Sequence, residues 1–461
     1  PASTAAAGGS QEEKADVVVW HWQDKRLQSQ QQVQATLDRN FNFLAAYRPA
    51  EKKFVRLADE RLADVAPAPG GRYGIGRDDD AYELMANLDG KRFQDIYVVD
   101  LATGERTLVL TKARWTYAAS PTGTHFAYYD DGHFYTYDMR NRQATNITKS
   151  VPTSFIDVEN DHPIEKPPTL FMGWSADGQS VLLSDGWDIW KVPVGGGIGT
   201  NLTINGRQER VRHRRPLDFS DETGFDLTKP LYIDLYAEWT KKSGLGVIEP
   251  GKPGVKRLAY GDAAYGVPPM LKARQADLFI FTRQTHTDPA DFYVTDASFA
   301  NPTRITNLAA GTEQFALSSG AMLVDYVSDK GDKLQGALFL PANYERGRTY
   351  PMVVNIYEKM SANLHAFARM TQPNPTTLNA TLYNSQGYAV LLPDITYKFN
   401  DPGMSAVWCV VPAVKAAIAT GIVDPKRVGL LGHSWGGYET AFLITQKDMF
   451  AAAVASAPIT D

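Results

Sequence analysis

The chain has 461 residues, of which 43% are hydrophobic and 21% charged, and its formal net charge is −5. These are the proportions of an ordinary folded protein, and a chain of this length exceeds the size at which one hydrophobic core stops growing, so two domains are expected. The 47 basic residues form no long cluster. This argues against a nucleic-acid partner and against an electrostatic membrane anchor.

A single cysteine, Cys409, excludes an intrachain disulfide and a cysteine-based metal site. It lies in an apolar helical pattern, where a buried, unreactive side chain is expected. No apolar run reaches the length needed to span a bilayer. Residues 1–13 lack the pattern of a signal peptide and are expected to form a flexible lead-in. The compartment therefore stays open between periplasmic or secreted and cytoplasmic.

Between about residues 14 and 311, short β-rich runs alternate with turns that contain Gly, Asp or Pro. Strands are predicted at 95–100, 124–129 and 180–184, where β-branched and aromatic residues alternate between turn signals. A Ser-Pro-Thr-Gly turn precedes one unit and a Ser-Ala-Asp-Gly turn precedes another. Four-strand units that recur with the same turn chemistry favour a β-propeller, incomplete at its N-terminal end, over an irregular β-sandwich.

The pattern changes near residue 312. A predicted hairpin leads into apolar strands that alternate with helical segments, among them a helix over about 406–420 that ends at Gly421. Strands that are apolar throughout indicate a mostly parallel sheet covered on both faces. Residues 312–461 are therefore expected to form the N-terminal part of an α/β domain. Its strands are predicted at 350–357, 388–394, 428–431 and 451–456.

The most informative motif is Gly-His-Ser-Trp-Gly at residues 432–436. It follows the strand at 428–431 and precedes a helix-compatible stretch, which is the strand, sharp turn and helix of a nucleophile elbow. Gly432 and Gly436, two residues either side of Ser434, would let the strand and the helix pass close together. Ser434 is therefore predicted to be a nucleophile.

No histidine near Ser434 in the sequence stands where a catalytic triad requires one. An α/β-hydrolase carries its triad in the order Ser, Asp or Glu, His, yet the 461 − 434 = 27 residues after Ser434 contain no histidine. His433 is adjacent, but neighbouring side chains on such a turn diverge, so a packing role is expected for it. His365 is expected to be a loop contact.

Several segments together resemble the prolyl oligopeptidase family of serine peptidases, and most of all its dipeptidyl peptidase and acylaminoacyl peptidase branch. They are Gly-His-Ser-Trp-Gly-Gly-Tyr at 432–438, Tyr-Pro-Met-Val-Val-Asn-Ile-Tyr-Glu-Lys at 350–359, Val-Asp-Pro-Lys-Arg-Val at 423–428 and Trp-His-Trp at 20–22. The resemblance implies a β-propeller followed by an α/β-hydrolase domain. It also implies a chain truncated at both ends, with the triad Asp and His beyond residue 461.

The resemblance implies an oxyanion hole made by the Tyr357 hydroxyl and the backbone N–H of Trp435. Donors at these places would face the charge of a tetrahedral intermediate. No cofactor and no metal are expected. The partner implied is a peptide substrate, with a homo-oligomer possible.

One departure from the family bears on specificity. The glutamate pair with which dipeptidyl peptidases hold a substrate amine is missing from the β-rich repeats, since Glu12-Glu13 lies in the lead-in. Dipeptidyl or strict post-proline specificity is therefore unsupported. Two other functions stay open: a carboxylesterase with the same elbow, and a non-catalytic propeller that binds a partner. The 461-residue chain by itself is expected to be inactive.

Overall fold

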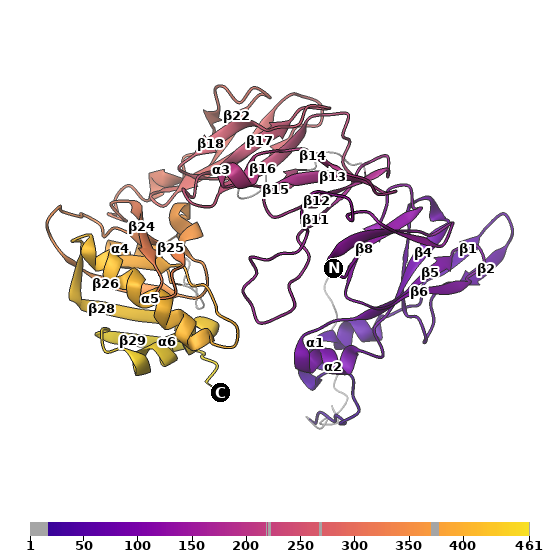
Figure 1. Ribbon diagram of the computed structural model, residues 1–461, viewed down its shortest axis with the longest axis horizontal. Coiled ribbons are helices and arrows are strands. Elements are labelled where there is room, and N and C mark those ends of the chain that lie inside the picture. Colours follow the sequence, from indigo (N-terminus) through magenta and orange to yellow (C-terminus); the bar gives the residue numbers. More distant parts are fainter. Residues whose placement is uncertain (1–16, 218, 220–222, 267–269, 370–377, 461) are drawn as a thin grey trace, which may run out of the picture. The chain divides into compact units, whose positions relative to one another are not determined.

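The computed structural model describes residues 17–217, 219, 223–266, 270–369 and 378–460 (Figure 1). The predicted lead-in at 1–13 lies outside these residues. The chain divides into two compact units. The first contains residues up to 130 together with 137–144, and the second contains 131–136 and the chain from 145 onward.

Two helices, α1 (Gln28–Arg39) and α2 (Glu83–Asp89), belong to the first unit. The expectation of β-rich repeats from about residue 14 is wrong over residues 28–39, where α1 forms. Unbranched glutamines in α1 have good helix propensity, and Arg26 donates to Asp38 near the other end of the helix (Nη2–Oδ2 2.9 Å). Strong local propensity therefore outweighs the β character of the surrounding sequence.

The β-rich part consists of antiparallel sheets, and in the four-stranded ones each strand pairs with the next strand along the chain, so that these sheets are meanders. In the first unit, β1 and β2 pair and β3 to β6 form a four-stranded sheet. The division between the units passes through the sheet of β7 to β10. The bounds are β1 Ala45–Arg48, β2 Lys53–Arg56, β3 Asp64–Pro67, β4 Tyr73–Asp78, β5 Gln94–Asp100, β6 Arg106–Ala113, β7 Trp115–Ala119, β8 His125–Asp130, β9 His133–Asp138 and β10 Gln143–Asn146.

Three further antiparallel sheets follow in the second unit: β11 to β14, β15 to β18, and a five-stranded sheet of β19 to β23. The strands predicted at 95–100, 124–129 and 180–184 are confirmed to within one residue as β5, β8 and β12. The bounds are β11 Phe171–Trp174, β12 Ser180–Ser184, β13 Ile189–Pro193, β14 Thr200–Asn201, α3 Gly206–Glu209, β15 Val211–Leu217, β16 Leu231–Ala237, β17 Ser243–Ile248, β18 Lys256–Gly261, β19 Ala264–Tyr265, β20 Leu271–Lys272, β21 Phe279–Thr285, β22 Asp288–Thr295 and β23 Thr303–Arg304.

The repeated turns owe their shape to their serine and glycine. Ser175 Oγ accepts a hydrogen bond from Ser180 N (2.9 Å), so the serine side chain caps the start of β12. Ser120 Oγ accepts from His125 N (3.2 Å) at the start of β8 in the same way. The glycine of each turn has a positive φ, +66° at Gly178, which a side chain disfavours.

The last part of the chain builds a six-stranded sheet in the order β24-β25-β27-β26-β28-β29. β27, β26, β28 and β29 are mutually parallel, whereas β25 is antiparallel to both β24 and β27. The expected strands are present, but the sheet is mixed, since the predicted hairpin joins it at one side. The bounds are β24 Ala321–Val327, β25 Lys333–Phe339, β26 Tyr350–Ile356, β27 Ala389–Pro393, β28 Val423–His433 and β29 Ala452–Ser456.

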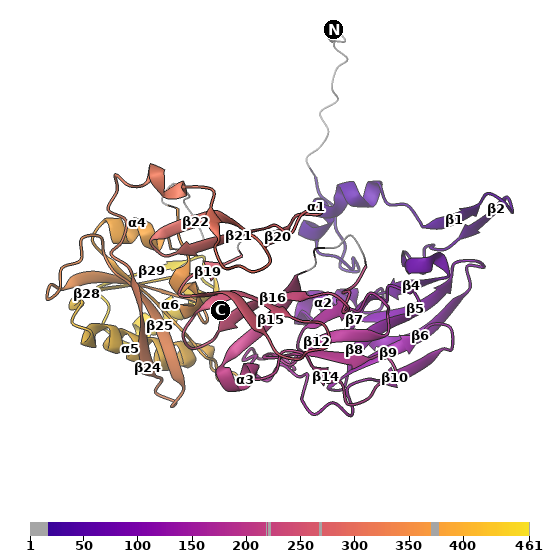
Figure 2. The ribbon, with the colours of Figure 1, turned by 90° about the horizontal axis from the view of Figure 1, so that it is seen from above.

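Helices cover both faces of this sheet (Figures 1 and 2). Leu338 of β25 packs with the buried residues of α5 (Pro402–Ala419), which is accompanied by α6 (Trp435–Gln446). Phe339, the next residue, packs on the opposite face with α4 (Ala380–Ser385) and the 3₁₀ helix η3 (Ser361–His365). This alternation follows from the two-residue period of a strand. The expectation that no apolar run is long enough to span a bilayer is wrong for α5, which is long and apolar enough to do so, but 56% of it is buried in the protein, as in a core helix.

Candidate active site

The predicted elbow is a strained turn in the structure. β28 ends at His433 and α6 begins at Trp435, so Ser434 alone forms the corner. Its backbone has φ +56° and ψ −114°, a conformation that costs a residue with a side chain on the order of 1–3 kcal/mol. Ser434 N donates to the carbonyl of Ser456 in β29 (2.9 Å), and Ser434 O accepts from Tyr438 N (3.0 Å). The surrounding sheet and helix therefore hold the strained corner in place.

Both elbow glycines lie where a side chain has no room. A Cβ on Gly432 would stand 2.1 Å from the carbonyl oxygen of Gly436, and a Cβ on Gly436 would stand 2.2 Å from the carbonyl oxygen of Ile356. These are backbone atoms, which cannot move aside without displacing the strand or the helix. The close approach of β28, α6 and β26 therefore requires glycine at both positions.

Replacing Gly432 by alanine is expected to destabilise the chain by about 2–3 kcal/mol, because the new methyl group would overlap backbone. The matched control is Gly429→Ala in the same strand, where the nearest atoms to the added Cβ are 3.8 and 3.9 Å away. Urea denaturation of both variants measures the difference. Equal stability of the two variants would contradict this account of the elbow.

Tyr357 follows the last residue of β26 and lies beside the elbow. Its Cδ2 is 3.5 Å from the position that a Cβ on Gly436 would take, and the side chain is 41% exposed. Within the described part of the chain its hydroxyl has no hydrogen-bond partner. The backbone N–H of Trp435 is the first of α6 and has no acceptor within the helix. The ring of Tyr357 thus lies beside Gly436 of the elbow, and the Trp435 N–H follows Ser434 directly in the chain.

The hydroxyl of Tyr397, which follows β27, contacts both the residue after β26 and residues of α6 at the elbow. Its hydroxyl oxygen is 2.6 Å from the carbonyl oxygen of Tyr357, 3.1 Å from Nε1 of Trp435 and 2.5 Å from Oε1 of Glu439. Neither Tyr397 nor Glu439 was predicted from the sequence to be a site residue. One signal in the sequence could have indicated Tyr397. It follows β27 as Tyr357 follows β26, and the carboxyl ends of neighbouring parallel strands lie at the same edge of the sheet.

A loop from the β-rich region also reaches this site. Asp161 Oδ2 accepts from the backbone N–H of Tyr397 (2.9 Å), and Nε2 of His162 is 3.1 Å from Oε1 of Glu358. These contacts join residues about 200 positions apart. They were not predicted from the sequence, because no local pattern encodes so distant a contact.

No histidine among the described residues hydrogen-bonds to Ser434, and the Oγ of this serine has no partner there. His433 turns instead to Ser456 (Nδ1–Oγ 3.2 Å), in keeping with its expected packing role. His365 lies in η3, where burial lowers its pKa, and its buried Nε2 finds no partner in the described part of the chain. Among the described residues, no histidine therefore lies within hydrogen-bonding distance of the Ser434 hydroxyl.

Cys409 is buried in α5, as expected, and burial raises its thiol pKa. This makes a reactive thiolate unfavourable. Within the residues that the structure describes, no group of three or more His, Cys, Asp or Glu side chains is arranged to hold a metal ion.

A polar pocket of about 560 Å³ adjoins the loops that carry Tyr357 and Tyr397. It shares Lys359, Asp394 and Thr396 with those loops, and ten of its fifteen lining residues are charged, six basic and four acidic. Asp394 is structural, since its carboxylate accepts from the backbone N–H of Ser361 (2.8 Å) and from its hydroxyl (2.6 Å).

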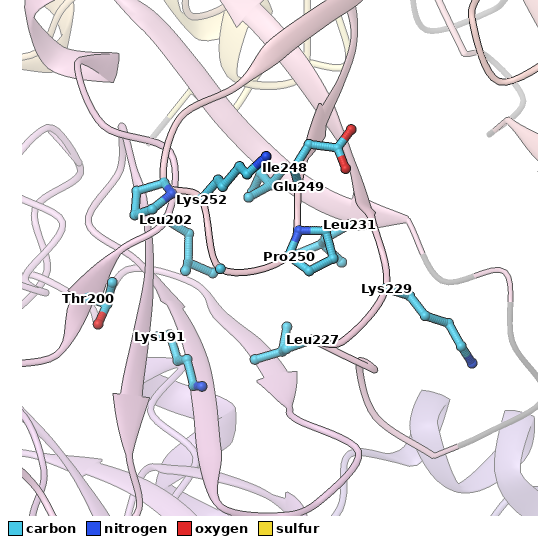
Figure 3. Close-up of a pocket in the computed structure, with 12 residues that line it drawn as sticks. Lys191, Thr200, Leu202, Leu227, Lys229, Leu231, Ile248, Glu249, Pro250 and Lys252 are labelled. Atoms are coloured by element: carbon cyan, nitrogen blue, oxygen red, sulfur yellow. The ribbon is translucent and has the colours of Figure 1, made fainter.

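A smaller pocket of about 180 Å³ lies in the β-rich region (Figure 3). Leu227, Leu231 and Ile248 line it together with Pro250, and none of the site residues described above contributes to it. It is therefore separate from the candidate active site.

Residues 407–461, which contain the elbow, match the sequence model of the prolyl oligopeptidase family. The resemblance to that family is confirmed. An uncharacterised peptidase of Bacillus subtilis (strain 168), YuxL, is 28% identical over 150 residues, which are 30% of this chain and 22% of that protein. The chain thus matches about a fifth of the length of this relative.

Solved structures share the fold over most of the chain. A Bacteroides ovatus protein provisionally assigned as a dipeptidyl aminopeptidase IV has a TM-score of 0.58 at 14% identity, covering 90% of this chain and 69% of that one. A Mycobacterium tuberculosis puromycin-hydrolyzing peptidase has a TM-score of 0.55 at 17% identity, covering 91% of this chain and 66% of that one. Dipeptidyl peptidase 4 of Porphyromonas gingivalis has a TM-score of 0.51 at 13% identity, covering 91% and 71%.

Proposed function

We propose that this chain is part of a serine peptidase of the prolyl oligopeptidase family that cleaves peptide bonds through an acyl-enzyme on Ser434. The observation that carries the proposal is the strained corner at Ser434, with Tyr357 and the N–H of Trp435 beside it. A strained turn of this kind is retained where it presents a reactive hydroxyl.

The domain organisation proposed is a propeller within residues 14–311, whose strands begin after α1, and an α/β-hydrolase domain over 312–461. Consecutive four-stranded antiparallel sheets, the topology of propeller blades, support the first assignment. The mixed sheet with its elbow at the carboxyl end of β28 supports the second.

In the proposed mechanism Ser434 Oγ attacks the scissile carbonyl while a histidine takes its proton. The oxyanion then accepts hydrogen bonds from Tyr357 and Trp435 N–H, and the histidine returns the proton to the leaving amine. We assign this histidine and its aspartate to a part of the enzyme that follows residue 461. The hydrolase triad order and the partial coverage of the relatives support this assignment.

Peptides suit the polar pocket better than lipid acyl chains do. Its lining is mostly charged, and charged side chains covered by a ligand need polar partners, which amide groups supply and acyl chains do not. A carboxylesterase with the same elbow is the competing function. The complete enzyme should turn over an aminoacyl amide with a higher kcat/KM than a simple acyl ester of similar size, and the reverse preference would favour the esterase.

The 461-residue chain by itself is expected to turn over neither substrate detectably. Without a histidine beside Oγ the hydroxyl is too weakly acidic to attack an amide at neutral pH, and loss of a triad member costs roughly 10⁴-fold or more. Assays of the purified chain with a chromogenic aminoacyl amide measure this. Robust turnover would mean that a histidine such as His365 supplies the base. A silent complete enzyme would instead favour a non-catalytic binding protein.

A further inference from the structure

The hydrogen bonds around Tyr397 require one more proton than the tyrosine carries. Its oxygen has three partners: the carbonyl oxygen of Tyr357 (2.6 Å), Nε1 of Trp435 (3.1 Å) and Oε1 of Glu439 (2.5 Å). A carbonyl only accepts, an indole N–H only donates, and a tyrosine has a single O–H. If the hydroxyl proton goes to Tyr357 O, then the contact with Glu439 needs its proton from the glutamate.

An ionised Glu439 would not fit these distances. It would accept the hydrogen bond from the Tyr397 hydroxyl. No proton would then lie between the Tyr397 oxygen and the carbonyl oxygen of Tyr357, which are 2.6 Å apart. A protonated carboxyl satisfies all three contacts, because Tyr397 donates once and accepts twice. The geometry thus favours the neutral acid.

The surroundings of Glu439 agree with a neutral acid. The residue is 0% exposed, and Oε2 has no hydrogen-bond partner in the described residues. Burial raises the pKa of this carboxyl well above its usual value, and the negative charge of Glu358 raises it further, whereas the hydrogen bond with Tyr397 lowers it. A buried carboxylate without a cation is costly, so the group keeps its proton.

We propose that Glu439 is a neutral carboxylic acid that positions the oxyanion tyrosine, Tyr357, through the hydroxyl of Tyr397. Glu439 itself touches no substrate in this arrangement. It donates to Tyr397, which leaves the Tyr397 proton free to hold the backbone carbonyl of Tyr357. The inference rests on the proposed function for the role of Tyr357, but the protonation of Glu439 stands independently of it.

The hydrogen bond from Tyr397 to the Tyr357 carbonyl should depend on pH. Below the raised pKa, Glu439 is neutral and Tyr357 is held. As pH rises through that pKa, Glu439 ionises and accepts the hydrogen bond of the Tyr397 hydroxyl. The Tyr357 carbonyl then loses its hydrogen-bond donor. The titratable groups that act on Glu439 among the described residues are Tyr397 and Glu358, and Glu358 in turn faces His162. His433 of β28 is turned to Ser456.

The first experiment measures the proton on the chain itself, with Glu439→Gln as the isosteric neutral variant. An unfolded glutamate ionises near pH 4.5, so the wild type should lose stability relative to the glutamine variant as pH rises from 4.5 to the folded pKa. The Tm of the wild type minus that of Glu439→Gln should therefore fall as pH rises above 4.5 and level off above the folded pKa. The infrared spectrum of the wild type should also show a protonated carboxyl stretch that Glu439→Gln removes. Parallel Tm profiles together with an unchanged carboxyl stretch would overturn the proposal.

The second experiment tests positioning in the complete enzyme. Glu439→Gln can still donate to Tyr397 and should keep kcat within about threefold, with the alkaline decline of kcat moved to higher pH. Glu439→Leu removes the hydrogen bond that orients the Tyr397 hydroxyl toward the Tyr357 carbonyl and should lower kcat about tenfold at unchanged KM, the equivalent of one hydrogen bond of about 1.4 kcal/mol. Equal loss in both variants would show that the charged form is needed and would overturn the proposal.

The two experiments separate this inference from the proposed function. If the complete enzyme cleaves no peptide, the proposed function fails, while the Tm and infrared measurements still decide whether Glu439 is neutral. If the enzyme is active but both variants behave as wild type at every pH, the proposed function holds and the positioning role fails.

Discussion

Replacing Ser434 by alanine in the complete enzyme is expected to lower kcat by on the order of 10⁶-fold, because the acyl-enzyme can no longer form. A fluorophosphonate probe should label the wild type on this residue and leave Ser434→Ala unlabelled. Among the serines that the structure describes, Ser434 is the one whose backbone has a positive φ, +56°, as the corner of a nucleophile elbow requires.

Ser456 offers a matched control for this experiment. It lies opposite the elbow in β29, but its hydroxyl contacts His433 (3.2 Å). Ser456→Ala should therefore keep both probe labelling and most of the activity. Persistent labelling of Ser434→Ala would refute the assignment of the nucleophile.

Replacing Tyr357 by phenylalanine is expected to lower kcat by roughly 100- to 1000-fold with little change in KM. The hydroxyl has no partner among the described residues, and in the proposed mechanism it meets its acceptor only when the oxyanion develops, so its loss should affect the transition state more than substrate binding. Steady-state kinetics with one peptide substrate separates the two parameters. The ring remains in phenylalanine, so its packing beside Gly436 is kept.

The control for this substitution is Tyr438→Phe, which removes a hydroxyl from the first turn of α6 and keeps a ring that packs against Trp435. It should change kcat less than threefold, since a hydroxyl away from the oxyanion contributes little. A rise in KM alone in Tyr357→Phe would contradict its role in the oxyanion hole and would assign it to substrate binding.

The elbow could be predicted from the sequence because all of its determinants lie within a few residues. An apolar strand, a serine flanked by glycines and a helix-compatible segment suffice to specify the turn, and the structure has β28, Ser434 and α6 in that order. The strands of the β-rich region were predictable for the same reason, since β-branched alternation and the Ser-x-x-Gly turns act locally. α1 was not predicted, although the helix propensity of its glutamines is an equally local signal.

Only the tertiary structure decided how the site is held together. Tyr397 and Glu439 are 42 residues apart and Asp161 and Tyr397 are 236 apart, yet each pair is in hydrogen-bond contact. Such contacts depend on the register of parallel strands and on the path of a long loop, neither of which leaves a periodic signal in the sequence. The proton on Glu439 follows from burial and from the number of donors around one oxygen. Both are properties of the folded chain, because an isolated glutamate in water would be ionised at neutral pH.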